Sequence, residues 1–413
     1  MTPFQPEDQP GESFRRLLLH LPLPEDPEED ITAFNAESFA ATLKRSHVEV
    51  LTVVTPTRPD TQHDVSAESA LEVSCVDLVS RLTVACCREG LIVEDAISNG
   101  EAAGVSLAFF ASRPALEAAC YSRVCRGLPL TLEDSLSPAG TLDAEAYRQL
   151  GVVFDEIEFK EPWCRGAKAL VEIGVLSSSQ PTSSNSGAAR ILQAGGYGFE
   201  LLETSADFTP YRVLILPEDI PLDSDLRARI QAYLQERGKL LATFESLHAS
   251  EQSSFGIESG GGNETGKGLN APGTGNIALL PEPHFRAYAQ SAGTRHKQAV
   301  LEALKRLLPD PLLRHDGPGT LETILTEQAE HHRWVLHLLH YLPMGMAFDS
   351  PMRDDILPVQ EVKFSLKMPK PVKRVVLRPQ HHDELDFWEH QGRVEFVVPK
   401  ITGHRMVSIE MAS

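Results

Sequence analysis

The chain has 413 residues, of which 42% are hydrophobic and 23% charged, and this composition is typical of a globular protein. Its net charge at pH 7 is -20, and no block of lysine and arginine interrupts the acidic composition. Phosphate groups and anionic lipids would be repelled, so we expect neither a nucleic-acid nor a membrane partner. At about 100–200 residues per domain, the length predicts two to four domains.

Residues 1–11 are polar, acidic and rich in proline, without the basic and apolar regions of a signal peptide. No apolar run reaches the length of about 18 residues that a membrane-spanning helix needs. A cytoplasmic protein is therefore expected. The cysteines form no CxxC pair and are interpreted as buried free thiols, so we expect no metal and no cofactor. They are Cys75, Cys86, Cys87, Cys120, Cys125 and Cys164.

The first 155 residues alternate between strand and helix patterns. Strands are predicted at 14–23, 47–55, 91–94 and 128–132, and helices at 35–46, 76–89, 115–126 and 143–155. Asn35 is placed to cap the first helix, and Gly90 to end the second. Because strands and helices alternate strictly over the first 95 residues, we predict a parallel sheet there.

The next segment alternates still more regularly. Strands are predicted at 169–176, 199–204, 212–217 and 239–244, and helices at 186–194 and 223–237. Asp223 is placed to cap the last helix and Gly238 to close it. This pattern predicts a doubly wound, flavodoxin-like parallel sheet. Beyond a Gly/Ser-rich linker at 251–275, the pattern predicts a helix at 296–308.

The C-terminal part changes to alternating apolar runs separated by turns. These runs lie at 333–342, 359–366, 372–377 and 394–398. Such runs are typical of antiparallel strands, so we predict a C-terminal β-sandwich.

Two motifs are considered for chemistry and set aside. Residues 261–268 approach a phosphate-binding P-loop, but Gly268 stands where a Ser or Thr is needed for the magnesium ion. The turn after strand 239–244 would carry the nucleophilic cysteine of an amidotransferase, but it reads Glu245-Ser246-Leu247. Ser246 is a formal alternative nucleophile that lacks the G-x-S-x-G surroundings. We expect an ordinary strand end there.

The histidines and acidic residues are harder to assign. His331-His332 and His381-His382 would point to opposite faces of a strand, so neither pair suits one metal ion. His337 and His340 lie in a strand pattern, and all are expected to be core or surface histidines. Glycoside cleavage uses two carboxyl groups, for which Glu133, Asp134 and Glu161 are candidates by context. A solvated or capping role for each is the alternative.

Three segments carry a family resemblance. They are Glu161–Leu176 (EPWCRGAKALVEIGVL), Gly187–Leu192 (GAARIL) and Tyr211–Phe244 (YRVLILPEDIPLDSDLRARIQAYLQERGKLLATF). They resemble the β-galactosidase trimerisation-type domain of bacterial glycosyl hydrolases related to α-L-fucosidases and family 42 β-galactosidases. Residues 16–20, 34–54 and 77–93 look like the first βα units of the family's TIM barrel, and 132–151 like a segment near its end. The run at 333–341 resembles its terminal sandwich.

The sequence departs from the family in length and in its polar motifs. Only about 160 residues precede the flavodoxin-like segment, whereas a complete barrel takes about 250 residues. The family's His-x-Asp-x-His motif reads His20-Leu21-Pro22-Leu23-Pro24 here. Its Cys-His-His-Gly-type motif appears as residues 56–59 (PTRP), and its Gly-Asp-Gln-Leu-His-Pro-type motif as residues 133–138 (EDSLSP). Framework positions match, while most polar site positions are replaced.

The resemblance therefore implies an α/β protein of three parts: an incomplete TIM-barrel-like region at 1–165, a flavodoxin-like trimerisation-type domain at 166–310 and an antiparallel β-sandwich at 311–413. Asp134 and Glu161 are the candidate catalytic residues, and Trp163, Glu133 and His20 the candidate sugar-binding ones. A degenerate, non-catalytic homologue is the first hypothesis. An active glycosidase and a purely structural oligomerisation protein remain open. The implied partners are a carbohydrate, copies of the chain in a trimer, or an active paralogue.

Overall fold

The structure is a computed structural model, and it describes residues 13–21, 35–54, 78–95, 105–107, 110, 112–136, 142–178, 182–247, 255, 269–270, 276–342, 355–379 and 383–412. The motifs at 22–24, 56–59, 137–138, 261–268 and 381–382 lie outside these residues. The chain forms two compact units that divide at Lys168 and Ala169, apart from short segments between 343 and 356. Each unit is described separately.

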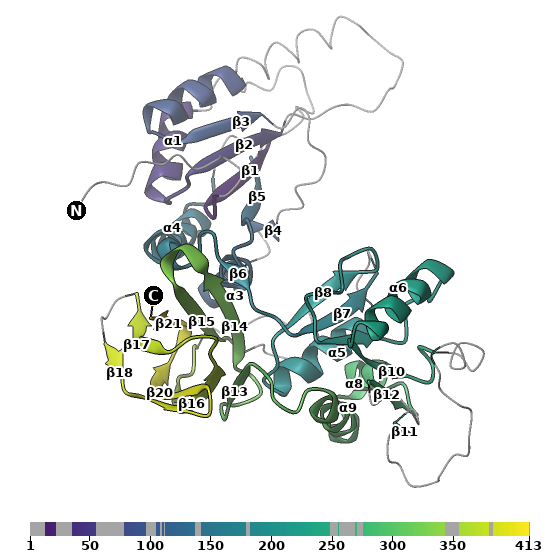
Figure 1. Cartoon of the computed structure of the whole chain (residues 1–413). Coiled ribbons are helices and arrows are strands. Elements are labelled where there is room, and N and C mark those ends of the chain that lie inside the picture. Colours follow the sequence, from purple (N-terminus) through teal and green to yellow (C-terminus); the bar gives the residue numbers. More distant parts are fainter. Residues whose placement is uncertain are drawn as a thin grey trace, which may run out of the picture. The chain divides into compact units, whose positions relative to one another are not determined.

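The first unit is built on a parallel sheet of five strands in the order β3-β2-β1-β5-β4 (Figure 1). The strands are β1 (Arg16–His20), β2 (Val50–Val54), β3 (Ile92–Asp95), β4 (Val105–Ser106) and β5 (Thr131–Ser135), and the helices are α1 (Ala36–Arg45), α3 (Arg113–Val124) and α4 (Ala144–Lys160), with a further helix at 78–88. The predicted parallel strands are thus present. Asn35 caps α1 by accepting from the Ser38 amide at 2.9 Å, and Gly90 takes a left-handed φ of 79°.

The two faces of this sheet differ in polarity. Residues in register share a face, so Leu17 lies beside Leu51 and Leu132, all fully buried. The opposite face carries the intervening residues, among them Arg16 and His20, which are only partly buried. Apolar and polar side chains therefore alternate along these strands. The face of Leu17 packs into a core, and the face of His20 carries polar groups.

The second unit begins with a six-stranded sheet in the order β11-β12-β10-β9-β7-β8. Its strands are β7 (Ile173–Ser177), β8 (Phe199–Glu203), β9 (Val213–Leu216), β10 (Lys239–Thr243), β11 (Leu269–Asn270) and β12 (Ile277–Leu280). Only β11 is antiparallel, and the others follow the 2-1-3-4-5 order of flavodoxin-type sheets. The four strands predicted for this segment are all present.

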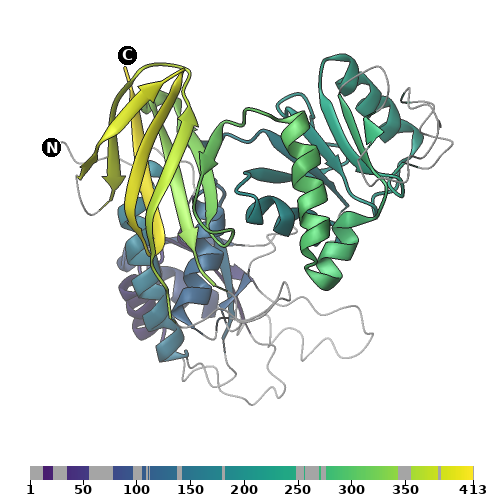
Figure 2. The ribbon, with the colours of Figure 1, turned by 90° about the horizontal axis from the view of Figure 1, so that it is seen from below.

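Helices cover both faces of this sheet. Buried side chains of α5 (Ser183–Ala194), α8 (His284–Ser291) and α9 (Thr294–Leu307) share one core with the sheet, whereas those of α6 (Ser224–Gln235) belong to a second core. Figure 2 shows the green helices of this segment lying along the sheet. Asp223 caps α6 as predicted, by accepting from the Leu226 amide at 2.8 Å. The left-handed residue after α6 is Arg237 rather than Gly238.

The C-terminal part consists of two antiparallel sheets that share one core. One has the order β13-β16-β20-β19 and the other β18-β17-β21-β15-β14-β6. Their strands are β6 (Lys168–Ala169), β13 (Leu313–His315), β14 (Glu322–Gln328), β15 (Arg333–His340), β16 (Val359–Lys367), β17 (Val372–Arg378), β18 (Glu384–Leu385), β19 (Phe387–His390), β20 (Arg393–Ile401) and β21 (Gly403–Met411). The molecule therefore combines parallel and antiparallel sheets, as the sequence predicted. No helix in the described part of the chain is long and apolar enough to cross a membrane.

Candidate functional site

The polar groups of the first unit gather at the carboxyl-terminal ends of its strands. His20 ends β1, and the neighbouring strand β5 carries Glu133, whose Oε2 lies 3.8 Å from His20 Nε2. Their side chains are 42% and 26% exposed, so a ligand can reach both. In parallel α/β sheets this is the edge at which ligands bind, and we take it as the candidate site.

A second charged pair lies on the same face. Arg16 of β1 forms an ion pair with Glu94 of β3, and both side chains are mostly buried. The strand register places Leu18 beside Thr52, Thr52 beside Glu94, and Leu18 beside Glu133. Glu94 and Glu133 therefore lie at the same height along the strand direction. Their strands, β3 and β5, are separated by β2 and β1.

That separation concerns the backbones that carry the two carboxylates. Neighbouring strands lie about 4.8 Å apart, so the backbones that carry Glu94 and Glu133 are about 14 Å apart along the sheet. The two carboxyl groups of a glycosidase lie roughly 5–9.5 Å apart. Glu94 is also held by Arg16. Both side chains reach toward β1, Glu94 to Arg16 and Glu133 to His20, so the two carboxylates lie closer together than their backbones.

Asp134 points to the other face of the sheet. As the residue next to Glu133 on a strand, it projects oppositely, and its Oδ2 accepts a hydrogen bond of 2.8 Å from the Tyr147 hydroxyl of α4. Its Oδ1 accepts from the Ser135 amide at 2.8 Å. Tyr147 is 2% exposed, and burial together with the Asp134 carboxylate raises the pKa of its phenol. Asp134 thus joins β5 to α4.

Glu161 lies at the opposite end of the strands. Its Oε1 accepts from Arg15 Nε at 2.8 Å, and Arg15 directly precedes β1. Its Oε2 accepts from Arg165 Nη2 at 2.9 Å, and Arg165 also reaches Glu49, which precedes β2. This carboxylate is 93% buried, within an ion-pair network at the amino-terminal edge of the sheet.

Trp163 follows Glu161 in the same 3-10 turn, Glu161–Trp163, and is partly buried. The five predicted site residues are thus divided among three places. His20 and Glu133 are brought together at the carboxyl-terminal edge, Asp134 lies on the helix-covered face, and Glu161 with Trp163 lies near the amino-terminal edge. Their catalytic and sugar-binding roles remain predictions.

The second unit has its own polar edge after β7, β9 and β10. Ser246, the formal alternative nucleophile, is buried and donates to the Leu216 carbonyl at 2.9 Å, which fits the ordinary strand end expected there. Arg286 of α8 forms ion pairs with Glu245 at 2.6 Å and with Asp219. Glu218 is buried, accepts from the Phe285 amide at 3.1 Å, and has its pKa raised by burial. This edge is tied together by its own ion pairs.

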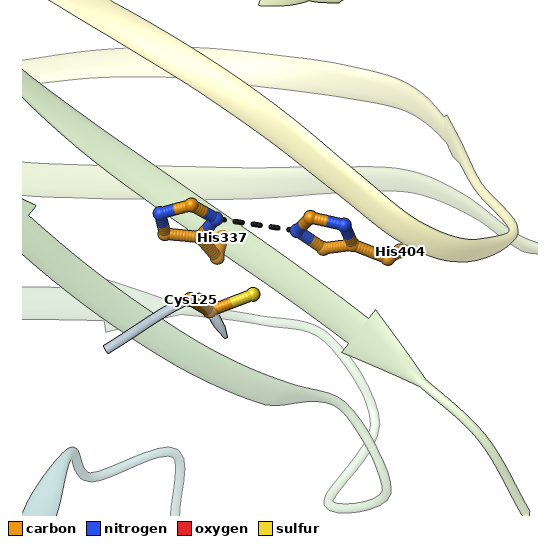
Figure 3. Close-up of side chains that lie close together, drawn as sticks. All are labelled: Cys125, His337 and His404. Carbon is orange, nitrogen blue, oxygen red and sulfur yellow. Dashed lines mark hydrogen bonds between the residues drawn. The ribbon is translucent and has the colours of Figure 1, made fainter. Parts of the chain in front are cut away.

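Two histidines of the sandwich, His337 and His404, are core residues, whereas His331 and His332 are exposed. His337 of β15 and His404 of β21 are 0% and 7% exposed, and Nδ1 of the first lies 3.2 Å from Nε2 of the second (Figure 3). Four cysteines are buried thiols outside any disulfide, as predicted, whereas the prediction is wrong for Cys87, which is exposed, and Cys75 lies outside the described residues. Burial raises the pKa of the Cys86 thiol to about 11, so it is an unreactive group at neutral pH.

Sequence reasoning missed the Arg16–Glu94 ion pair on the polar face of the first sheet. The signal was available, since both residues fall on predicted strands whose alternation puts them on the face of His20. The helix at 284–291 was also missed, because its eight residues hold too little periodic pattern.

No protein-family model matches the sequence, and no curated protein matches it. The fold does match solved structures. α-L-fucosidase isoenzyme 2 from Paenibacillus thiaminolyticus is 20% identical, with a TM-score of 0.65 over 94% of this chain and 81% of that one. A family 42 β-galactosidase from G. stearothermophilus is 12% identical, with a TM-score of 0.46 over 95% and 63%. A β-galactosidase from Bacillus circulans sp. alkalophilus is 9% identical, with a TM-score of 0.47 over 91% and 61%.

The chain thus has a glycoside-hydrolase-like fold, and the likeness to the fucosidase extends over most of its length. It spans less than two thirds of each of the two galactosidases. At 20% identity or less, these matches establish the fold alone. The polar edge around His20 and Glu133 must therefore be judged on its own geometry.

Proposed function

We propose that this chain is a glycoside-hydrolase homologue without hydrolytic activity, which acts in carbohydrate binding or in assembly with a partner. One observation carries the proposal. The polar face of the five-stranded sheet carries Glu94 and Glu133, and its strand order is that of the first three and last two strands of a barrel. The central barrel strands, whose ends contribute to the active sites of such enzymes, have no counterpart among the described residues. Asp134 and Glu161 do not supply a further carboxylate beside Glu133, because neither shares its face and edge.

The proposed architecture is an incomplete barrel at 1–165, a flavodoxin-like domain at 166–310 and a sandwich at 311–413. The order β3-β2-β1-β5-β4 supports the first part. In a closed (β/α)₈ barrel the first strand lies between the second and the last. The five strands are therefore arranged as the first three and last two strands of a barrel, and its central strands have no counterpart in the part of the chain that the structure describes.

Assembly is the second half of the proposal. The resemblance to the trimerisation-type domain supports a homo-oligomer, specifically a trimer, or a complex with an active paralogue in the cytoplasm. A sugar would meet His20 and Glu133, which offer a hydrogen-bonding imidazole and carboxylate at an accessible edge.

The alternative is an active glycosidase of the α-L-fucosidase or β-galactosidase type. Only the fold supports this alternative, because the matched α-L-fucosidase has the same fold. A purely structural oligomerisation protein would bind no sugar at all. Activity and sugar binding therefore separate the three hypotheses.

The test combines turnover and binding on the full chain. Aryl α-L-fucosides and β-galactosides are assayed with the unmodified protein and with Glu133→Gln, Asp134→Asn and His20→Ala, and fucose and galactose are titrated by calorimetry. We expect no turnover, and weak saturable binding that His20→Ala removes. Glu145→Gln, an exposed carboxylate on α4, is the matched control. Turnover that disappears in Glu133→Gln or Asp134→Asn would overturn the proposal. If the protein forms a trimer but binds neither fucose nor galactose, the hypothesis of a purely structural oligomerisation protein is supported instead.

A further inference from the structure

Three potential metal ligands converge where β12 leads into α8. The chain leaves β12 as Pro281-Glu282-Pro283-His284, and His284 is the first residue of α8. His296 lies in the first turn of α9, and its Nδ1 is 2.9 Å from Nδ1 of His284. One ligand atom of each of Glu282, His284 and His296 lies within 4.8 Å of the other two. We propose that these residues bind a divalent transition-metal ion of the zinc type.

The meeting of two Nδ1 atoms is the main observation. Two imidazoles that face each other through Nδ1 share one proton at most, and two protonated rings would repel each other. A metal ion engages the lone pairs of both. His284 is 4% exposed, so a metal ion bound to it would be largely shielded from water on that side.

The chemistry of the three groups selects the metal. Two nitrogens and one carboxylate oxygen match the His₂Glu sets of zinc sites that keep a fourth position open, whereas calcium and magnesium prefer oxygen ligands alone. In a tetrahedral zinc site two nitrogens lie about 3.3 Å apart, given bonds of about 2.0–2.1 Å. The observed 2.9 Å requires only a small opening, which the partly exposed ring of His296 allows.

The backbone holds the ligands in place before any metal arrives. Pro281 and Pro283 fix the backbone on both sides of Glu282, and the His284 amide donates to the Glu282 carbonyl at 2.8 Å. The next residue, Phe285, is anchored by Glu218. Arg295 forms an ion pair with Glu282, but Arg295 is 72% exposed, so this pair is weak. Because the Glu282 carboxylate has two oxygens, one can coordinate the metal while the other retains the ion pair with Arg295.

This site lies on the doubly wound part of the second unit and is independent of the carbohydrate proposal. The test uses the full chain carrying Cys87→Ser, so that the exposed thiol does not bind metal. The protein is stripped with a chelator and titrated with Zn²⁺ by calorimetry and with Co²⁺ by absorption. We expect one equivalent per chain, a tetrahedral Co²⁺ spectrum without a thiolate charge-transfer band, and a Zn²⁺-dependent rise in Tm.

His284→Asn, His296→Gln and Glu282→Gln are compared with the control His331→Gln/His332→Gln, which alters exposed histidines. Each site variant should weaken binding at least about tenfold, and the control should not. Glu282 is 44% exposed, so its variant tests the site even where a histidine variant fails to fold. Unchanged affinity in Glu282→Gln and His296→Gln, a thiolate band, or no saturable binding would each overturn the proposal.

Discussion

Arg15 and Glu161 join the two ends of the first unit's described chain. Nε of the guanidinium lies 2.8 Å from Oε1 of the carboxylate, the residues are 146 positions apart, and their side chains are 11% and 10% exposed. The pair ties the start of β1 to the turn after α4. A carboxylate held this way, at the edge opposite His20, has a stabilising role that is sufficient to explain its burial.

Glu161→Gln should therefore unfold the protein more easily. The substitution removes the buried carboxylate that Arg15 contacts most closely, while the more exposed Glu49 and Glu158 still compensate part of its charge, so we expect a loss of about 2 kcal/mol in the free energy of unfolding. Glu158→Gln is the control, because Glu158 contacts the same arginine at 3.3 Å but is 48% exposed, and should cost at most about 0.5 kcal/mol. Urea unfolding measures both. Equal effects of the two variants would show that Glu161 does not stabilise the fold.

The Tyr147–Asp134 hydrogen bond should likewise be structural. Tyr147→Phe leaves Asp134 without its buried donor, so we expect a loss of about 1.5–3 kcal/mol in the free energy of unfolding. Asp134→Asn should have a similar effect, and the double variant should cost little more than either single one, because both remove the same bond. Additive effects in this double-mutant cycle would rule out the coupling.

Gly187 allows α5 and α8 to approach closely. A Cβ at this position would lie 1.9 Å from the Phe285 carbonyl oxygen, a backbone atom that cannot move without shifting α8. Gly187→Ala should therefore destabilise the protein by about 3 kcal/mol in thermal unfolding, although alanine favours helices. Gly198→Ala is the control, since a Cβ there meets nothing within 4 Å, and it should change stability by less than about 0.5 kcal/mol.

The core patterns could be predicted from sequence because burial imposes periodicity. The runs at 239–244 and 212–217 are mostly apolar, and the structure places their strands at the centre of the doubly wound sheet. The site could not be predicted in the same way. Glu133 and Asp134 are neighbours in sequence, yet the pleat sends them to opposite faces, and Glu161 is turned away by Arg15 from a distant segment. The opposite orientations follow from strand alternation, but the predicted strand ends at 132, before Glu133. The pairing of Glu161 with Arg15 depends on tertiary contacts that no local pattern encodes.

Glu218 should make stability fall as the pH rises. Burial raises the pKa of this carboxyl above its ordinary value of 4.5, despite amide hydrogen bonds that favour the anion. Below about pH 4.5 the group is neutral in both states and contributes no pH dependence. Above it, the unfolded chain releases its proton while the folded chain keeps it, so the unfolded state is favoured until the folded pKa is passed.

Glu218→Gln removes this ionisation. The Tm of the variant relative to the unmodified protein should therefore rise from about pH 4.5 toward neutral pH and then level off. Glu236→Gln, an exposed carboxylate at the end of α6, should show no such trend. Differential scanning calorimetry across this pH range measures the difference directly. A Tm difference for Glu218→Gln that stays constant with pH would mean that the buried carboxyl ionises equally in both states.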